Sequence, residues 1–228
     1  MTKELIRQKF KNRLNKAKDS QNKLYMDLIL NKKIEILLQQ IISNLKKQKR
    51  KPHSRINILL YFPLDIEFNC LKLLNKFKKQ KNTQIFLPFM SDINLKMVEY
   101  RLPLGRQAFG IYQPNGSLFR NNKLDIAIIP VLGIDMDFRR IGFGKGIYDR
   151  FFMNLKKQPI TIFVSRALNY HNSKITQYHD VKTSIYITPF ATIKDKIHDS
   201  SNIKFRSIST NSRFRRLPSF TQNIQHKL

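Results

Sequence analysis

Five short apolar runs, separated by segments with helical spacing, constrain the fold of this chain more than any other feature. They are INILLYF (56–62), TQIFLP (83–88), LDIAIIPVLGI (124–134), ITIFVS (160–165) and SIYITP (184–189). Runs of this length are typical of strands buried on both faces, which occur in parallel sheets whose connections are helices. The alternation predicts an α/β fold: a single three-layer domain with a mainly parallel central sheet flanked by helices.

The segments between these runs carry the spacing that such a fold requires. Helices are expected over residues 2–17, 24–47, 66–79 and about 145–157, and KMVEYRL (96–102) suits a half-buried strand. In the first helix, Leu5, Phe10 and Leu14 have roughly helical spacing. Pro88 and Pro130 should end their strands, because proline cannot donate to the ladder of hydrogen bonds.

The charge balance limits the possible partners. Lys and Arg number 43 against 15 Asp and Glu, which gives a net charge of +28. The resulting electric field attracts nucleic acid, anionic lipid or phosphate-rich small molecules. Part of the excess of basic residues is explained equally well by a general abundance of Lys, Asn and Ile in this sequence. KKQKRK (46–51), KFKKQK (76–81) and RFRR (213–216) could contact phosphates, so a basic nucleic-acid-binding protein is the rival interpretation. No recognised RNA-binding pattern of interleaved aromatic residues accompanies them.

Other features exclude several classes of protein. A single cysteine, Cys70, excludes an intrachain disulfide framework and a cysteine-based zinc site. The charged N-terminus lacks the apolar core of a signal peptide, and the apolar runs are shorter than the roughly 20 residues of a membrane span. We expect a cytoplasmic monomer with no membrane partner. Residues 200–228 hold six Ser, six Lys or Arg and no acid, so the domain should end near residue 190 and 191–228 should form a basic, disordered tail.

The segment IGFGKG (141–146) is unusual in a chain with seven glycines. Its three glycines are Gly142, Gly144 and Gly146. A loop between strand and helix lies at the carboxyl edge of the sheet, where α/β proteins bind ligands. Successive N–H groups near a helix start bind anions, and Arg140 and Lys145 add positive charge. Neither a Walker loop nor a dinucleotide fingerprint fits, because Gly146 follows the lysine and Ile147 stands where the fingerprint has glycine. The alternative is a tight connection in which the glycines only relieve steric crowding.

Asp149 adds a carboxylate one turn into the helix. Beside a phosphate site, such a group is a natural partner for Mg²⁺. A favourable charge at a helix start is the alternative.

The stretch PVLGIDMDFRRIGFGKGIYDRFF (130–152) resembles the signature of the 5-formyltetrahydrofolate cyclo-ligase family, in which a buried strand ending in proline leads to Arg-Leu-Gly-x-Gly-x-Gly-x-Tyr-Asp. Other matching parts follow in order over roughly residues 3–190. They are the pair Lys3 and Arg7, the acidic Asp65 and Glu67 after the first strand, FGIYQP (109–114), and Asp180 before the last strand.

The resemblance implies a ligase that converts 5-formyltetrahydrofolate to 5,10-methenyltetrahydrofolate, requires ATP and Mg²⁺, and proceeds through a phosphorylated formyl group. It implies ATP-binding roles for Lys3, Arg7, Arg140, Gly142, Phe143, Gly144, Lys145, Gly146, Ile147 and Tyr148, with Lys145 and Arg140 catalytic. It implies folate contacts from Leu60, Asp65, Glu67, Phe143 and Tyr148, and magnesium ligands in Asp149 and Asp180. Its partners are thus small molecules, and nucleic acid would bind only through non-specific charge.

Three positions depart from the family pattern. Phe138 replaces a glycine, so we expect the turn there to be built differently. Asp65 stands where glutamate is usual, and Ser184 stands where a further aspartate is common. These changes indicate a divergent member. An ATP-using enzyme of similar fold with another substrate, or a protein that keeps the fold without the chemistry, remains the alternative.

Overall fold

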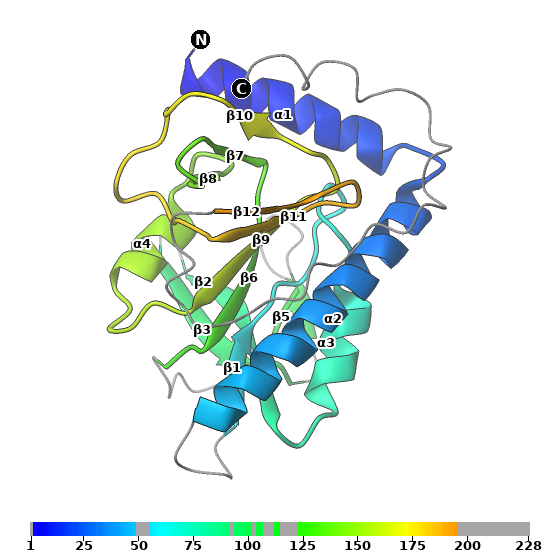
Figure 1. The fold of residues 1–228 in the computed structure, drawn as a ribbon, viewed down its shortest axis with the longest axis vertical. Coiled ribbons are helices and arrows are strands. Elements are labelled where there is room, and N and C mark those ends of the chain that lie inside the picture. Colours follow the sequence, from blue (N-terminus) through cyan, green and yellow to red (C-terminus); the bar gives the residue numbers. More distant parts are fainter. Residues whose placement is uncertain are drawn as a thin grey trace.

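The computed structural model describes residues 2–48, 55–91, 94–101, 104–106, 112–114 and 123–195 (Figure 1). The helices are α1 (Lys3–Lys18), α2 (Lys23–Gln48), α3 (Leu71–Lys78) and α4 (Ile147–Met153). The strands are β1 (Ile56–Leu59), β2 (Thr83–Ser91), β3 (Asn94–Glu99), β4 (Leu104–Arg106), β5 (Tyr112–Pro114), β6 (Ile126–Pro130), β7 (Gly133–Asp135), β8 (Arg140–Ile141), β9 (Ile160–Val164), β10 (Tyr170–His171), β11 (Ile185–Ile187) and β12 (Thr192–Lys194).

The central sheet confirms the predicted α/β fold. Its seven strands lie in the order β12-β11-β9-β6-β1-β2-β3. The five inner strands run parallel, and β12 and β3 pair antiparallel at the two edges. A small sheet, β10-β7-β8, and a hairpin of β4 and β5 complete the strand pairing of the described residues.

Alternating side chains divide the molecule into three layers. Ile126 and Ile128 pack in the cluster formed with α2 and α3 on one face of the sheet. Ala127 and Ile129 pack on the other face, against α4 and the small sheet. Burying each large aliphatic side chain contributes about 1.5–3 kcal/mol, so both faces need cover. In Figure 1, α2 and α4 accordingly lie on opposite sides of the strands.

Helix α1 packs across the end of the molecule that holds β7, β8 and β10 (Figure 1). Its buried residues are Ile6, Phe10 and Leu14, which pack with Leu132 and Ile141. The expectation that Leu5 belongs to this face was wrong, because Leu5 is 54% exposed and Ile6 takes its place. This packing sets α1 beside the loops that follow β6.

Two expected element ends lie elsewhere. β2 continues through Pro88, which pairs with Met97 of β3. Pro88 lies beyond the last residue that β1 pairs, Phe86, and proline is tolerated where a strand lacks one neighbour. The third helix begins at Leu71 rather than at residue 66, because residues 63–70 form an irregular loop that the Asn69 side chain ends by accepting the N–H of Leu71 at 3.1 Å.

The other differences concern α4 and the end of the domain. α4 stops at Met153, and the oxygen of Phe152 accepts from the N–H of Leu155 at 3.2 Å and from the side chain of Gln158 at 2.8 Å. The sheet continues past the boundary expected at residue 190, since β12 pairs with β11. Residues 196–228 of the expected tail, and residues 109–111 of FGIYQP, lie outside the described residues. None of the described helices has a stretch long and apolar enough to cross a membrane.

Candidate active site

The glycine segment lies between β8 and α4, beyond the carboxyl end of β6. This confirms the predicted order of strand, loop and helix, although the short strands β7 and β8 intervene. Gly146 is the N-cap of α4 and has φ of 61°. This left-handed conformation is not helical and is unfavourable for residues other than glycine. α4 therefore begins at Ile147, two residues after the predicted start at residue 145.

Gly142 is required by the side chain of Arg140. A Cβ atom at Gly142 would lie 2.5 Å from Nη1 and 2.6 Å from Cζ of Arg140. The guanidinium therefore rests on the backbone of the glycine segment. It also donates to Oδ2 of Asp149 at 3.3 Å and lies over the ring of Tyr148, with 4.9 Å from Cζ to the ring centre. Arg140 is buried, so water screens its charge less and the charge acts more strongly on groups near this loop.

Gly144 faces α1. Its φ is 103°, and a Cβ atom there would lie 3.6 Å from the guanidinium carbon of Arg7. Arg7 donates to the exposed Glu4 at 2.9 Å through Nη1, while its Nε is buried without a hydrogen-bond partner. Nε of Arg140 is also buried without a partner. Two guanidinium groups, each with a buried Nε that has no hydrogen-bond partner, thus lie beside the glycine backbone, and guanidinium groups are typical partners of anions.

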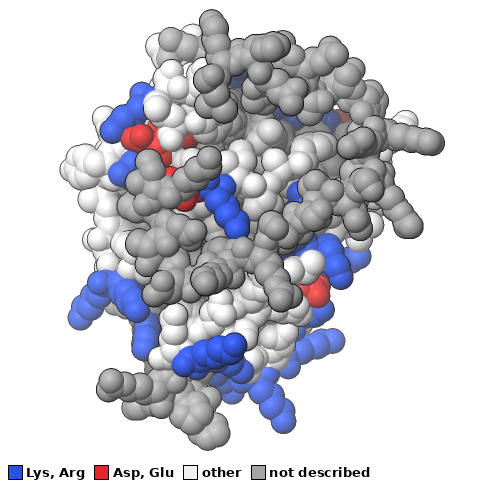
Figure 2. All heavy atoms as spheres, in the orientation of Figure 1, with Lys and Arg blue, Asp and Glu red and all other residues white. Residues whose placement is uncertain are grey.

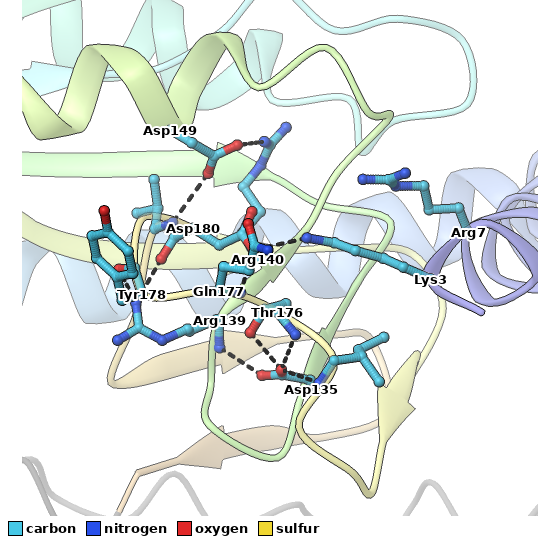
Figure 3. Close-up of polar contacts among 12 residues, drawn as sticks. Lys3, Arg7, Asp135, Arg139, Arg140, Asp149, Thr176, Gln177, Tyr178 and Asp180 are labelled. Carbon is cyan, nitrogen blue, oxygen red and sulfur yellow. Dashed lines mark hydrogen bonds and ion pairs between the residues drawn. The ribbon is translucent and has the colours of Figure 1, made fainter. Parts of the chain in front are cut away.

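The two candidate magnesium ligands meet around Val181. Asp149 accepts the N–H of Val181 at 3.0 Å, and Asp180 immediately precedes that residue. Asp180 accepts from Nζ of Lys3 at 2.8 Å and from the N–H of Gln177 at 2.8 Å. Figure 3 shows Lys3 and Arg7 extending from α1 toward this region. Each carboxylate is therefore paired with a cation of its own.

This donor set fits Mg²⁺ only in part. Among the described residues, no three His, Cys, Asp or Glu side chains are grouped closely enough to hold a metal ion. Mg²⁺, however, commonly takes one or two carboxylates and completes its shell with water and phosphate oxygens. Asp149 and Asp180 supply two hard oxygen donors on adjacent segments, and each is already paired with a cation, Arg140 or Lys3. A magnesium role for the two carboxylates therefore stays a prediction.

Phe143 points toward a second region, a small pocket at the carboxyl ends of β6 and β9. Its lining includes Phe143, Glu67, Val131, Ser165 and Arg166. Burial raises the pKa of Glu67 to about 7, against the opposing effects of the Leu64 N–H and of Arg140 and Arg166. Burial also raises the pKa of Tyr148, and the charge of Glu67 adds to this rise. Glu67 thus connects the pocket electrostatically to the glycine segment.

The other expected folate residues lie apart from the pocket lining. Asp65 is exposed and pairs with Lys23 at 2.7 Å and Lys18 at 3.7 Å. This hydrogen bond from Lys23 lowers the pKa of Asp65. Leu60 has its side chain in the core beneath α2. The exposed Lys145 stands in the glycine segment between Gly144 and Gly146.

Two important residues escaped the sequence reasoning. Asp135 is fully buried and accepts from the N–H groups of Arg139 and Thr176, so it joins β7 to the loop before Asp180. Arg166 is also buried, and it pairs with Asp27 of α2. No local motif marks the contact of Asp135 with Thr176 or that of Arg166 with Asp27, because these partners lie far along the chain.

Phe138 takes an unusual backbone conformation. Its φ is 57°, in the left-handed region in which glycine is favoured, and whether the turn differs from that of the family stays a prediction. Asp135 holds the turn by accepting the N–H groups of Asp137 at 3.1 Å and Arg139 at 3.2 Å. A non-glycine residue in this region costs of order 1–3 kcal/mol.

Comparison with known proteins gives one consistent result. The sequence model of the 5-formyltetrahydrofolate cyclo-ligase family matches residues 1–189. A 5-formyltetrahydrofolate cyclo-ligase of Mycoplasma pneumoniae is 30% identical over 99 residues, which is 42% of this chain and 60% of that protein. One of Haemophilus influenzae is 28% identical over 137 residues, 55% of this chain and 71% of that protein.

Solved structures agree with the fold. A 5,10-methenyltetrahydrofolate synthetase of Aquifex aeolicus superposes with a TM-score of 0.61 at 22% identity, covering 94% of this chain and 100% of that one. The synthetase of Mycoplasma pneumoniae gives a TM-score of 0.56 at 21% identity, covering 82% of this chain and 98% of that one.

Proposed function

Because the chain belongs to the 5-formyltetrahydrofolate cyclo-ligase family, we propose that it converts 5-formyltetrahydrofolate and ATP to 5,10-methenyltetrahydrofolate, ADP and phosphate. One observation supports this most directly. The buried, unpaired Nε atoms of Arg7 and Arg140 lie beside a backbone of three glycines, and an anion such as a triphosphate would satisfy them.

The chemistry explains why such a site needs cations. The formyl oxygen is a poor leaving group, so it first attacks the γ-phosphorus of ATP and ADP departs. N10 of the same folate then attacks the activated carbon and releases its proton to solvent, and phosphate leaves with that oxygen. Both reacting centres belong to one molecule, so proximity supplies much of the rate. The transferring phosphoryl group carries charge that the protein must neutralise.

The cations of the glycine segment and of α1 would share this task. Arg140 is held against Gly142 and Tyr148, so its guanidinium is oriented before ATP binds. Lys145 and Arg7 approach from the loop and from α1. Mg²⁺, held by Asp149 and Asp180 when bound, would neutralise further phosphate charge.

Glu67 would serve the other substrate. A carboxylate in an apolar pocket accepts hydrogen bonds from amino and ring N–H groups of a pterin. Phe143 lines the same pocket. The pKa of the Tyr148 phenol is raised by the charge of Glu67 and lowered by that of Arg140, so Tyr148 interacts with both groups. Folate and ATP would therefore meet where the pocket and the glycine segment adjoin.

The rival function, nucleic-acid binding, rests on net charge. On the face drawn in Figure 2, the described Lys and Arg side chains form separate groups, with Asp and Glu between some of them. Binding through such charges alone loses affinity steeply with salt. The rival would be favoured by tight polynucleotide binding at low salt in a protein that forms no methenyl product.

The test is product formation by the purified full chain. Methenyltetrahydrofolate is followed by its absorbance while ADP is measured in the same reaction. We expect one ADP for each methenyl group, and product only when 5-formyltetrahydrofolate, ATP and Mg²⁺ are all present. ADP release without methenyl product would assign the chain another substrate.

A further inference from the structure

A buried ion pair joins α2 to the end of β9 beside the pocket. Arg166 is 1% exposed and donates from Nε to Oδ1 of Asp27 at 2.8 Å and from Nη2 to Oδ2 at 2.9 Å. Two parallel bonds of this kind fix both side chains in one geometry. Neither residue has a part in the chemistry described above.

The same two side chains hold both ends of the loop that carries Glu67. Arg166 uses its remaining nitrogen, Nη1, to donate to the main-chain oxygen of Asp65 at 2.8 Å. Asp27 accepts the N–H of Asn69 at 3.4 Å. Glu67 lies midway between these two ties. The five-residue loop is thus clamped by one ion pair at its first and last residues.

Burial of this pair calls for more than stability as an explanation. An ion pair taken out of water recovers little more than its desolvation cost, and apolar replacements of similar volume are often as stable. Arg166 also lines the pocket together with Glu67 and Phe143. Two of its three hydrogen bonds go to Asp27 of α2, and the third goes to the main chain of Asp65, just before the pocket-lining Ile66 and Glu67.

We infer that Arg166 and Asp27 are positioning residues for the folate part of the site, which clamp residues 65–69 so that Glu67 faces the pocket. This inference rests on the proposed function and deepens it. It predicts that the pair governs the binding of 5-formyltetrahydrofolate and leaves the binding of ATP unaffected, because the side-chain bonds that define the clamp join Arg166 and Asp27 to each other and to the main chain of residues 65 and 69.

The charge of Arg166 adds a second effect on Glu67. Burial raises the pKa of Glu67, and the Leu64 N–H, Arg140 and Arg166 oppose that rise. The phenols of Tyr61 and Tyr148 and the thiol of Cys70 are the other titratable groups coupled to it. Loss of Arg166 should therefore move the pH dependence of folate binding toward higher pH.

The decisive variant is the double replacement Asp27→Leu with Arg166→Met. A single replacement would leave one buried charge unpaired and could unfold the chain. The double replacement removes the clamp and both charges while it retains apolar volume. Lys76→Met is the matched control. Lys76 of α3 forms an exposed ion pair, at 2.6 Å, with Glu35, which lies on α2 as Asp27 does.

Steady-state kinetics and hydrogen exchange provide the two readouts. In the double variant, we expect KM for 5-formyltetrahydrofolate to rise about tenfold or more, and KM for ATP to stay within about twofold. The amides of residues 64–71 should exchange faster, while those of β6 and β9 should not. Lys76→Met should match the wild type in both readouts.

Each outcome bears on the inference separately from the proposed function. Unchanged exchange over 64–71, or an unchanged KM for the folate in an active enzyme, overturns the inference. A wild-type protein that forms no methenyl product overturns the proposed function, and the exchange result then decides whether the clamp exists. Equal rises in both KM values would assign the pair a general structural role and overturn the positioning role.

Discussion

At the scale of single residues, the site is organised by close contacts between glycine backbone and arginine side chains. Gly142 leaves room for the guanidinium of Arg140, and Gly144 faces that of Arg7. The composition of the loop follows from this, since any side chain at Gly142 would occupy the position of the Arg140 charge. Steric relief, one of the two roles weighed for the glycines, is therefore present at Gly142, and anion binding stays a prediction.

Gly142→Ala tests this arrangement. The new methyl group would displace the end of Arg140 and loosen its buried ion pair with Asp149, so the free energy of unfolding should fall by about 1–3 kcal/mol. KM for ATP should rise about 10- to 100-fold, because charge-assisted hydrogen bonds of about 1.5–3 kcal/mol would be lost. In an Arg140→Ala background the same glycine replacement should have almost no further effect. Additive effects of the two replacements would contradict the account.

Glu67 makes stability depend on pH. Its pKa rises from the ordinary 4.5 to about 7. Between these values the unfolded chain has lost this proton and the folded chain retains it, so the free energy of unfolding falls as pH rises. Glu67→Gln removes this loss. We expect urea denaturation to show the variant about 2 kcal/mol more stable than the wild type at pH 8.

The same comparison at low pH supplies the internal check. At pH 4 the carboxyl group of Glu67 is largely protonated in both the folded and the unfolded chain, so the stability advantage of Glu67→Gln should vanish. Glu4→Gln, which removes a carboxyl whose side chain is 80% exposed, is the control. An advantage for Glu67→Gln that is equal at pH 4 and pH 8 would contradict the raised pKa.

Residue-scale prediction from sequence was limited by long-range contacts. The motif from Arg140 to Asp149 was visible as a pattern, and the structure brings its members together. The long-range contacts of Asp135, Arg139 and Arg166 carry no local signal, because these partners lie about 40 to 140 residues away. The strain at Phe138 was also invisible, since only the backbone conformation reveals it.

At the scale of elements, α1 is the part whose position matters most. Its apolar residues pack on the loops after β6, and this turns Lys3 and Arg7 toward Asp180 and Gly144. The helix could be predicted from spacing, but its docking could not. Which of its many basic residues face the site depends on whether Leu5 or Ile6 is buried, and local spacing did not decide this.

Arg7→Met tests the role of α1. Its buried Nε has no partner, so removing the charge should leave the free energy of unfolding unchanged or slightly raised. KM for ATP should rise about tenfold or more, since a charged contact with phosphate would be lost, and KM for the folate should stay unchanged. Arg13→Met is the control on the exposed face of the same helix. Similar kinetic effects of both replacements would contradict the assignment.

At the scale of the whole molecule, the parallel sheet was the most predictable feature. Strands buried on both faces read as continuous apolar runs, and β1, β6, β9 and β11 lie within four of them. The edge strand β12 has no such run, because an edge is half exposed. Its pairing with β11, and the N–H of Asp195 donating to Ser184 at 3.0 Å, extend the domain beyond residue 190.

Two truncations test where the domain ends. A chain of residues 1–195 keeps β12, and we propose that it retains the stability and kcat/KM of the full chain. A chain of residues 1–190 loses β12 and the ion pair between Lys182 and Asp195, so its free energy of unfolding should fall by about 1–3 kcal/mol. Equal loss of activity in both chains would assign residues 196–228 a role in the reaction.

The most direct test of the central claim is the rate of methenyltetrahydrofolate formation by the Lys145→Ala variant. Wild type and Lys157→Ala, an exposed lysine shortly after α4, are measured beside it with 5-formyltetrahydrofolate, ATP and Mg²⁺. The account predicts that wild type and Lys157→Ala form product at similar rates, and that Lys145→Ala loses at least about 10²-fold in kcat/KM. Equal rates for all three proteins would show that the glycine segment does not act on the phosphates of ATP.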